Sequence, residues 1–399
     1  MKKGFFTFAS FATAALILGM IISTASAAET VLESPAPAAP AAAESAAAPT
    51  AAAPTVAAPA AESAPAPAPA QAEAAPVYYE TAQNPITIGG FIYSTWYDGF
   101  YPMNGDNHLA VNQTVLFMKK DLNTADYGAD WGFNVTGLYG TEHGQFADDG
   151  FDGKWGTSGD GYGASIYECY GALGWGNTSL KIGKFATPLG YESAVGPVRD
   201  LNSTSYIHGH HPAIFAGGLL TWNATDRLAL NGGFTKGSNN SFDKDGDYGF
   251  LFGAEFKWNP CMTISYEGMI NHVENDNVAN GTEYMHSVLL TWDLSCRTQY
   301  VFETSYGSVY DVDAQERTSD FIGFANYLKY KLYENVTSII RFEWFKENGE
   351  DEYKELTFGI KYNVTDHFML RPEIRYDWVN EGGSKDDGFS GGIGGAFLF

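Results

Sequence analysis

The last twelve residues, Gly388–Phe399, constrain the fold most strongly, because their side chains alternate in size. One face carries Phe399, Phe397, Ile393 and Phe389, whereas the other is mostly Gly, Ala and Ser. Successive side chains of a β-strand point to opposite faces. A strand of a bilayer-spanning barrel presents bulky residues to lipid and small residues to the lumen, whereas a soluble core needs bulk inside. We therefore expect a transmembrane barrel, and an edge strand of a soluble β-sandwich is the alternative.

The same alternation continues upstream, where charged residues occupy the inner face. In residues 368–378, apolar side chains alternate with Arg371, Glu373, Arg375 and Asp377. A packed core cannot accept so many charges, but a water-filled lumen can. Alternation with polar residues on one face also appears in residues 250–258 and 262–270, although with fewer charges.

Short turns alternate with longer, often acidic connections, which is the layout of outer-membrane barrels. The long connections are expected at residues 98–108, 141–163, 187–212, 237–247, 272–283, 308–319, 347–353 and 380–387. About sixteen antiparallel strands are predicted, beginning near residues 86, 109, 129, 165, 178, 213, 227, 248, 261, 284, 297, 320, 336, 353, 367 and 388. The first strand must then pair with the last. The fold class is an all-β transmembrane barrel.

The chain start predicts export. Lys2 and Lys3 precede an apolar run and an Ala-x-Ala site, so residues 1–27 are expected to be a cleaved signal peptide. Residues 28–76 are almost entirely Ala and Pro, and they predict a disordered periplasmic linker, either a spacer or a cell-wall tether. Residues 77–399 form the barrel, which we place in the bacterial outer membrane. The formal net charge of −24 argues against a nucleic-acid partner.

Six tight turns share one pattern, an aromatic residue followed by Asn, Asp or Glu and then Thr or Ser. The polar residues favour the turn, and the ring before it suits the membrane interface. We therefore expect an aromatic girdle on one side of the membrane. Its members are Trp175, Trp222, Trp258, Trp292, Tyr333 and Tyr362.

Two resemblances to known proteins support the barrel. The terminal strand, with Phe397 and Phe399, resembles the carboxy-terminal signature that the barrel assembly machinery of bacteria reads. Several segments also resemble outer-membrane β-barrel porins of the OmpL-like type. They are residues 130–140, 167–170 and 180–192, together with two shorter segments near 203–206 and 217–220. The most specific part is Gly-Lys-Phe-Ala-Thr-Pro-Leu-Gly-Tyr-Glu within residues 180–192. The resemblance implies a porin-like barrel and brings no established ligand residues with it.

The connection at residues 187–212 is the candidate for a pore constriction. By analogy with the third loop of general porins, it is expected to fold into the lumen. Its Glu192 and Asp200 would then face strand residues across the lumen and create a transverse field. The alternative is that these charges pair within the wall and stiffen the barrel. The strand residues are Arg341, Arg371 and Arg375, with Glu343, Glu373 and Asp377 beside them.

No catalytic, metal or cofactor site is expected. The Gly-Phe-Ser-Gly-Gly string at residues 388–392 matches a nucleophile elbow, but no helix follows it. Residues 243–247 resemble part of a calcium loop, but Tyr248 stands where the turn glycine belongs. His208, His210 and His211 could bind a transition metal, although an exposed His-rich loop is more often simply polar. Cys261 and Cys296, both at turns, could form a bridge between hairpins.

These observations favour a porin that admits small hydrophilic solutes by passive diffusion. Acidic residues on the outer loops would concentrate cations and give weak cation preference. A structural or adhesive anchor linked to the cell wall and a substrate-selective channel are the alternatives. The expected partners are outer-membrane lipid, the barrel assembly machinery and small solutes, and a homotrimer is expected by analogy with general porins.

Overall fold

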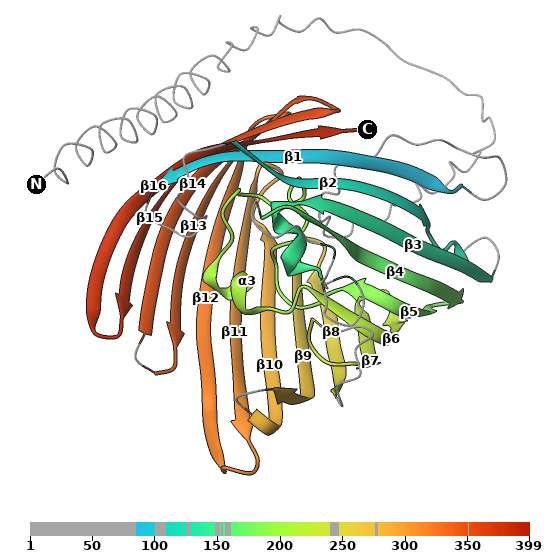
Figure 1. The fold of residues 1–399 in the computed structure, drawn as a ribbon. Coiled ribbons are helices and arrows are strands. Elements are labelled where there is room, and N and C mark those ends of the chain that lie inside the picture. The colour runs from blue at the N-terminus through green and yellow to red at the C-terminus, as the bar shows by residue number, and fades with distance from the viewer. Residues whose placement is uncertain are drawn as a thin grey trace, which may run out of the picture. The chain divides into compact units, whose positions relative to one another are not determined.

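The computed structural model describes residues 85–99, 109–124, 128–147, 152, 155, 161–239, 247–275, 278–349 and 351–399. They form a closed antiparallel barrel of sixteen strands (Figure 1). The strands are β1 Thr87–Gly99, β2 Leu109–Lys120, β3 Ala129–Gly140, β4 Gly163–Trp175, β5 Thr178–Ala186, β6 Ile214–Thr225, β7 Leu228–Thr235, β8 Tyr248–Asn259, β9 Met262–Asn275, β10 Val278–Asp293, β11 Thr298–Asp311, β12 Glu316–Tyr333, β13 Val336–Glu347, β14 Asp351–Thr365, β15 Phe368–Glu381 and β16 Ser384–Leu398.

Every strand pairs with its neighbours in sequence, and β1 closes the ring on β16. Ile92 lies opposite Phe397 in this last pairing. The backbone of Gly90 completes the closure, because its N–H donates to Phe399 O at 2.8 Å and its carbonyl accepts from Phe399 N at 3.0 Å. The predicted strand number and the predicted pairing of first and last strands are confirmed.

The alternation of faces is also as predicted. Phe397 and Phe399 are exposed on the outside, whereas Ala396 and Leu398 are buried within. The expected girdle residues all lie near the strand ends that the short turns connect, and they are 37–67% exposed. These six exposed residues are Trp175, Trp222, Trp258, Trp292, Tyr333 and Tyr362.

Three expected long connections are instead continuations of strands. In these segments the hairpins β9–β10, β11–β12 and β15–β16 continue as paired strands, and the last two of them end in tight turns. The prediction failed there because both faces of a hairpin carry polar side chains once it leaves the membrane. The apolar alternation disappears, but the backbone hydrogen bonds of the ladder remain.

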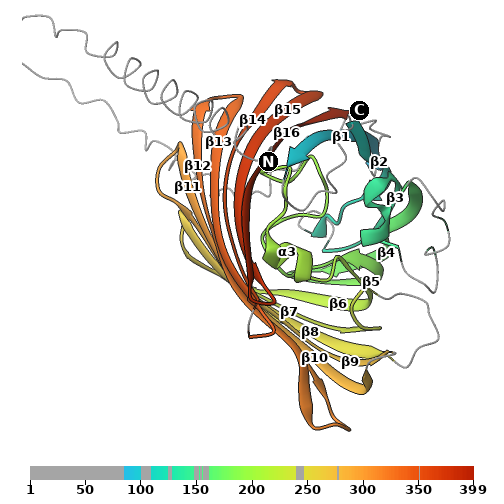
Figure 2. The ribbon, with the colours of Figure 1, turned by 60° about the vertical axis from the view of Figure 1, so that its left-hand side comes forward.

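Residues 187–213, which join β5 to β6, lie inside the ring of strands (Figure 2), and we call them the inner loop. They contain the short helix α3 Tyr206–His210. The 3-10 helix η1 Thr141–Gln145 follows β3 and also turns inward, so Glu142 is buried. Asp152 is buried too, although both acidic residues were expected on an outer loop.

Apolar side chains of the inner loop pack against the inside of the wall. Leu189, Tyr206 and Ile207 belong to one buried cluster with wall residues such as Phe321 and Phe345. Ala194 joins a second cluster that includes the ring of Tyr93 on β1. One side of the lumen is therefore filled like a protein core.

No helix among the described residues is long and apolar enough to cross a bilayer. Cys169, Cys261 and Cys296 are free and exposed, so the structure contains no bridge between the two turn cysteines. The predicted signal peptide and linker lie outside the described residues, as do Asp243 and Asp245 of the calcium-loop resemblance.

Candidate constriction of the lumen

The inner loop is held against the wall by three arginines that have no exposed surface, Arg341, Arg371 and Arg375. The Arg341 guanidinium on β13 bridges the loop and the wall. Its Nη1 is 2.5 Å from Glu192 Oε1 in the loop, and its Nε is 2.5 Å from Glu355 Oε1 on β14. It also donates to the carbonyl of Ser203 at 2.9 Å.

Arg371 on β15 donates hydrogen bonds to the loop segment before Ser203. Its Nε donates to Asn202 Oδ1 at 2.7 Å, and its Nη2 donates to Gly196 O and to Tyr93 Oη, both at 3.0 Å. It also donates to the carbonyl of Arg199. Because a guanidinium offers five N–H donors in a fixed plane, one side chain can hold several turns of irregular backbone.

Wall carboxylates accept from the backbone N–H groups of the loop. Glu373 accepts from Asn202 N at 2.5 Å and Ser203 N at 3.1 Å. Glu343 accepts from Tyr206 N at 2.7 Å and Ile207 N at 2.8 Å, the first N–H groups of α3. These are donors that a short helix leaves unsatisfied at its start, so the wall supplies the missing acceptors.

The third arginine and a wall aspartate hold the remaining part of the loop. Arg375 Nη1 donates to Thr204 O at 2.7 Å, and its Nη2 is 2.8 Å from Asp377 Oδ1. Asp377 also accepts from Tyr206 Oη at 2.9 Å. Both charges of this pair are therefore compensated within the buried layer.

The opposite edge of the loop is attached to β2 and η1. Gln113 Nε2 donates to Ala194 O at 2.8 Å, and its Oε1 accepts from Gly196 N at 2.8 Å. Arg199 Nη2 is 2.9 Å from Glu142 Oε2. The acidic η1 segment therefore neutralises the loop arginine, which explains why Glu142 is buried.

The expected arrangement of two charge rows across open lumen is not what the structure contains. Glu192 contacts Arg341 directly, and Arg371 and Arg375 lie between the loop and the wall. Glu343 and Glu373 lie in the same layer. Burying a charge is costly unless it is paired and hydrogen-bonded, so these residues compensate one another. The sequence supplied the correct residue types but not their common position.

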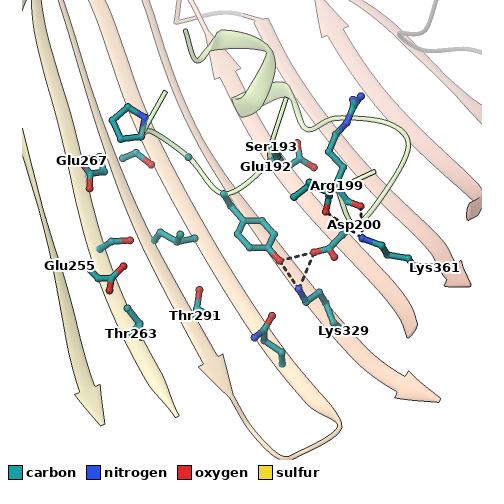
Figure 3. Close-up of a pocket in the computed structure, with 18 residues that line it drawn as sticks. Glu192, Ser193, Arg199, Asp200, Glu255, Thr263, Glu267, Thr291, Lys329 and Lys361 are labelled. Carbon is teal, nitrogen blue, oxygen red and sulfur yellow. Dashed lines mark hydrogen bonds and ion pairs between the residues drawn. The ribbon is translucent and has the colours of Figure 1, made fainter. Parts of the chain in front are cut away.

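A cavity of about 530 Å³ remains beside the inner loop (Figure 3). Lys329 on β12 and Lys361 on β14 line one flank, and Glu255 on β8 and Glu267 on β9 line the other. Polar residues of β9, β10 and β11 form the wall between these flanks. They are Thr263, Ser265, Ser287, Thr291 and Gln299.

Asp200, the second acidic candidate of the loop, lies on the basic flank of the cavity. Its Oδ2 is 3.1 Å from Lys329 Nζ and accepts from Tyr191 Oη at 2.6 Å. The side chains of Asp200 and Lys329 are 18% and 20% exposed, so this pair is partly open to the lumen. Lys361 Nζ donates instead to three loop carbonyls, those of Pro197, Val198 and Arg199, at 3.1–3.4 Å.

Proton binding by the loop carboxylates is shifted by the same contacts. Burial opposes ionisation of Glu192, but the guanidinium of Arg341, the His208 ring and the hydrogen bonds from Ser205 together outweigh it and lower the pKa of this carboxyl. Burial likewise opposes ionisation of Asp200, and Lys329 and Lys361 lower its pKa. Both groups are therefore anions at neutral pH, and their attachments to the wall are ionic.

The loop histidines have separate environments. His211 Nε2 is 2.9 Å from Ser305 Oγ, and its Nδ1 is 4.0 Å from Glu303. Burial lowers the pKa of His211 to about 3, so this ring is neutral at pH 7 and the contact with Glu303 is not an ion pair. His210 Nδ1 lies 2.8 Å from Tyr206 O. No group of three or more potential metal ligands occurs in the part of the chain that the structure describes.

The cavity residues Lys329, Lys361, Glu255 and Glu267 were missed at the level of sequence. Alternation places each on an inner face, as it does for Arg341 and Arg371, but it does not say which part of the inner face the loop covers. That depends on where residues 187–213 attach, which is a property of the closed barrel.

Comparison with known families matches residues 75–399 to the family model described as "Putative beta-barrel porin-2, OmpL-like". A comparison with curated protein sequences found no match. The barrel is similar to solved outer-membrane structures at identities that indicate a shared fold alone.

The outer membrane channel DcaP of Acinetobacter baumannii has a TM-score of 0.59 at 11% identity, over 81% of this chain and 99% of that one. An anion-selective porin from Comamonas acidovorans has a TM-score of 0.59 at 8% identity, over 79% of this chain and 100% of that one. The trimer form of OmpT from Vibrio cholerae has a TM-score of 0.53 at 10% identity, over 79% of this chain and 99% of that one.

Proposed function

Because this chain belongs to the OmpL-like family of β-barrel porins, we propose that small hydrophilic solutes cross the outer membrane by passive diffusion through the part of its lumen that the inner loop leaves free. The solute passes between the loop and the wall formed by β8 to β11. The constriction is the cavity lined by Glu255, Glu267, Lys329 and Lys361, together with the loop residue Asp200.

One observation carries this proposal. The inner loop is fixed to β13, β14 and β15 through Arg341, Lys361 and Arg371, which leaves a polar cavity on the β8–β11 side. Hydroxyl and amide groups there can replace part of the hydration shell of a solute. An apolar surface of the same width would hold no continuous water.

We also propose a weak preference for cations. Asp313, Glu381, Asp386 and Asp387 are exposed on the extended hairpins β11–β12 and β15–β16, at the end of the barrel opposite the expected girdle. Clustered negative charge raises the local concentration of cations, and salt screens the effect beyond a Debye length of about 10 Å at 0.1 M. The preference should therefore weaken as ionic strength rises.

Export by the signal peptide, recognition of Phe397 and Phe399 by the assembly machinery, and a homotrimer belong to the same proposal. The outward position of both rings on the closing strand supports recognition of an edge that is open before the barrel closes. The trimer form of the similar OmpT structure supports the oligomeric state.

A pair of tryptophan substitutions tests the pathway. Ser287 lines the cavity from β10, whereas the next residue, Val288, faces outward. Ser287→Trp should lower single-channel conductance in a planar bilayer because the indole fills the constriction, and Val288→Trp should leave conductance unchanged. Equal conductance in both variants would contradict the proposed pathway.

A further inference from the structure

The charged side chains that the strands contribute to the cavity are separated by sign. Glu255 and Glu267 lie on the β8–β9 flank, and Lys329 and Lys361 lie on the β12–β14 flank (Figure 3). We infer that this cavity favours zwitterionic solutes, small molecules that carry an ammonium and a carboxylate group, over neutral solutes of the same size. The inference rests on the proposed pathway and names the substrate class that the pathway selects.

The basic flank keeps a net positive charge. Lys329 is paired with Asp200, so these two charges largely cancel. Lys361 donates to carbonyl oxygens rather than to a carboxylate, so no ion pair cancels its positive charge. A solute carboxylate on this flank meets Lys361 and the ammonium group of Lys329.

The acidic flank has no lysine or arginine among its lining residues. Both oxygens of Glu267 accept from Asn231 Nδ2, at 2.9 and 3.1 Å, which orients the carboxylate along the wall. Gly253 on the neighbouring strand leaves space for this carboxylate, because a Cβ at Gly253 would lie 1.9 Å from Glu267 Oε2. Glu255 lies two residues further along β8 on the same face, so a solute ammonium group meets two carboxyl groups on this flank.

The region between the flanks suits the middle of such a solute. Ser287 and Thr291 on β10 and Gln299 on β11 offer donors and acceptors that are not charged. A cavity of about 530 Å³ is large enough for a molecule of amino-acid size with its water. A zwitterion can therefore align with the field, its ammonium toward β8–β9 and its carboxylate toward β12–β14, whereas a neutral solute has a much smaller dipole moment and gains less from orientation.

The test compares two isomeric solutes, L-alanine and lactamide, which have the same atoms and nearly the same size, although only alanine is a zwitterion at pH 7. Their entry into proteoliposomes is followed by swelling, with entry into protein-free vesicles subtracted. Two variants each remove charge from one flank. The acidic-flank variant combines Glu255→Gln with Glu267→Gln. The basic-flank variant is Lys361→Gln, in which the glutamine amide can still donate to the loop carbonyls. Lys257→Gln is the control, because Lys257 follows Glu255 on the same face of β8 but does not line the cavity.

Each flank variant should lower the ratio of alanine to lactamide entry by about threefold, which corresponds to about 0.7 kcal/mol. Lys257→Gln should leave the ratio unchanged. Because alanine has no net charge, a simple change in ion selectivity would not move this ratio. The reversal potential in a KCl gradient gives a second readout, since the acidic-flank variant should weaken cation preference and Lys361→Gln should strengthen it.

An unchanged alanine-to-lactamide ratio in either flank variant would overturn the zwitterion inference and leave the porin pathway intact. Failure of wild-type protein to admit either solute above protein-free vesicles would overturn both. A fall in the ratio for both flank variants and not for Lys257→Gln is the result that supports selection by the separated charges.

Discussion

At the scale of single residues, the main feature is a buried layer of charge between the inner loop and the wall. Arg341 touches Glu192 in the loop and Glu355 in the wall, and all three are almost completely buried. Such a group does not add stability in proportion to its number of contacts, because each charge first loses its hydration. The loss of one member nevertheless destabilises the group, because the remaining buried charges cannot be hydrated by solvent.

Arg341→Met should therefore destabilise the protein strongly. It leaves two buried carboxylates without their cation, and breaking a buried pair in this way costs about 3–5 kcal/mol. Urea unfolding in lipid vesicles, followed by tryptophan fluorescence, measures the change in the free energy of unfolding. Arg317→Gln is the matched control, because Arg317 forms an exposed pair with Asp320. An equal effect of the two substitutions would contradict the buried layer as described.

A second consequence at this scale is loss of stability in acid. The pKa of His211 is about 3 in the folded protein and about 6.5 when the ring is free, so the unfolded chain binds a proton first as pH falls. The stability due to the neutral ring is complete above pH 6.5 and is lost progressively toward pH 3. The lowered pKa values of Glu192 and Asp200 act in the same direction at lower pH.

His211→Asn should flatten this pH dependence. Between pH 7.5 and 5, one such histidine contributes a loss of about 2 kcal/mol that the variant should not show. Urea unfolding at several pH values provides the comparison with wild type. A variant whose stability falls between pH 7.5 and 5 by as much as that of the wild type would contradict a buried neutral His211.

At the scale of elements, the inner loop is packed and buried like a protein core, although most of its backbone is irregular. Its position could be partly predicted, since residues 187–212 are the longest of the connections predicted from sequence and carry both acidic candidates. Its contacts could not, because alternation identifies an inner face and says nothing of what lies on it. The same limit explains why the sequence predicts loops where the hairpins extend, because paired strands that are exposed to water on both faces have no apolar periodicity.

Gly190→Ala should loosen the inner loop. Gly190 has a φ of +86°, which disfavours other residues, and a Cβ there would lie 2.4 Å from His211 Nδ1. The loop must shift, and Arg199, which is 3% exposed, should become accessible. Cleavage after Arg199 by trypsin, identified by mass spectrometry, measures the release.

Gly209→Ala is the control within the same loop, because a Cβ at that position meets no heavy atom within 4 Å. It should leave cleavage after Arg199 at the wild-type rate. Rapid cleavage in the wild-type protein itself would contradict a loop that is fixed to the wall.

At the scale of the whole molecule, the barrel was predicted almost completely from sequence. Strand number, closure and facing follow from a period of two that a lipid exterior and a wet interior impose on every strand. The terminal strand is the clearest case, because Phe397 faces out and Ala396 faces in as its alternation requires. The division of the lumen into a filled half and an open half did not follow, since it depends on contacts between segments far apart in the chain, such as Asn202 and Arg371.

The central claim is that solutes pass along the β8–β11 wall and not beneath the inner loop. Single-channel recording during addition of a charged, water-soluble thiol reagent tests it most directly, with Cys169, Cys261 and Cys296 replaced by alanine. A cysteine at Ser265, which lines the cavity, should react and block the current. A cysteine at Ile264 should not react, because this residue faces outward. A cysteine at Thr357 should not react either, because Thr357 faces inward but is fully buried between Arg341 and Arg375. Block at Thr357 with none at Ser265 would contradict the account.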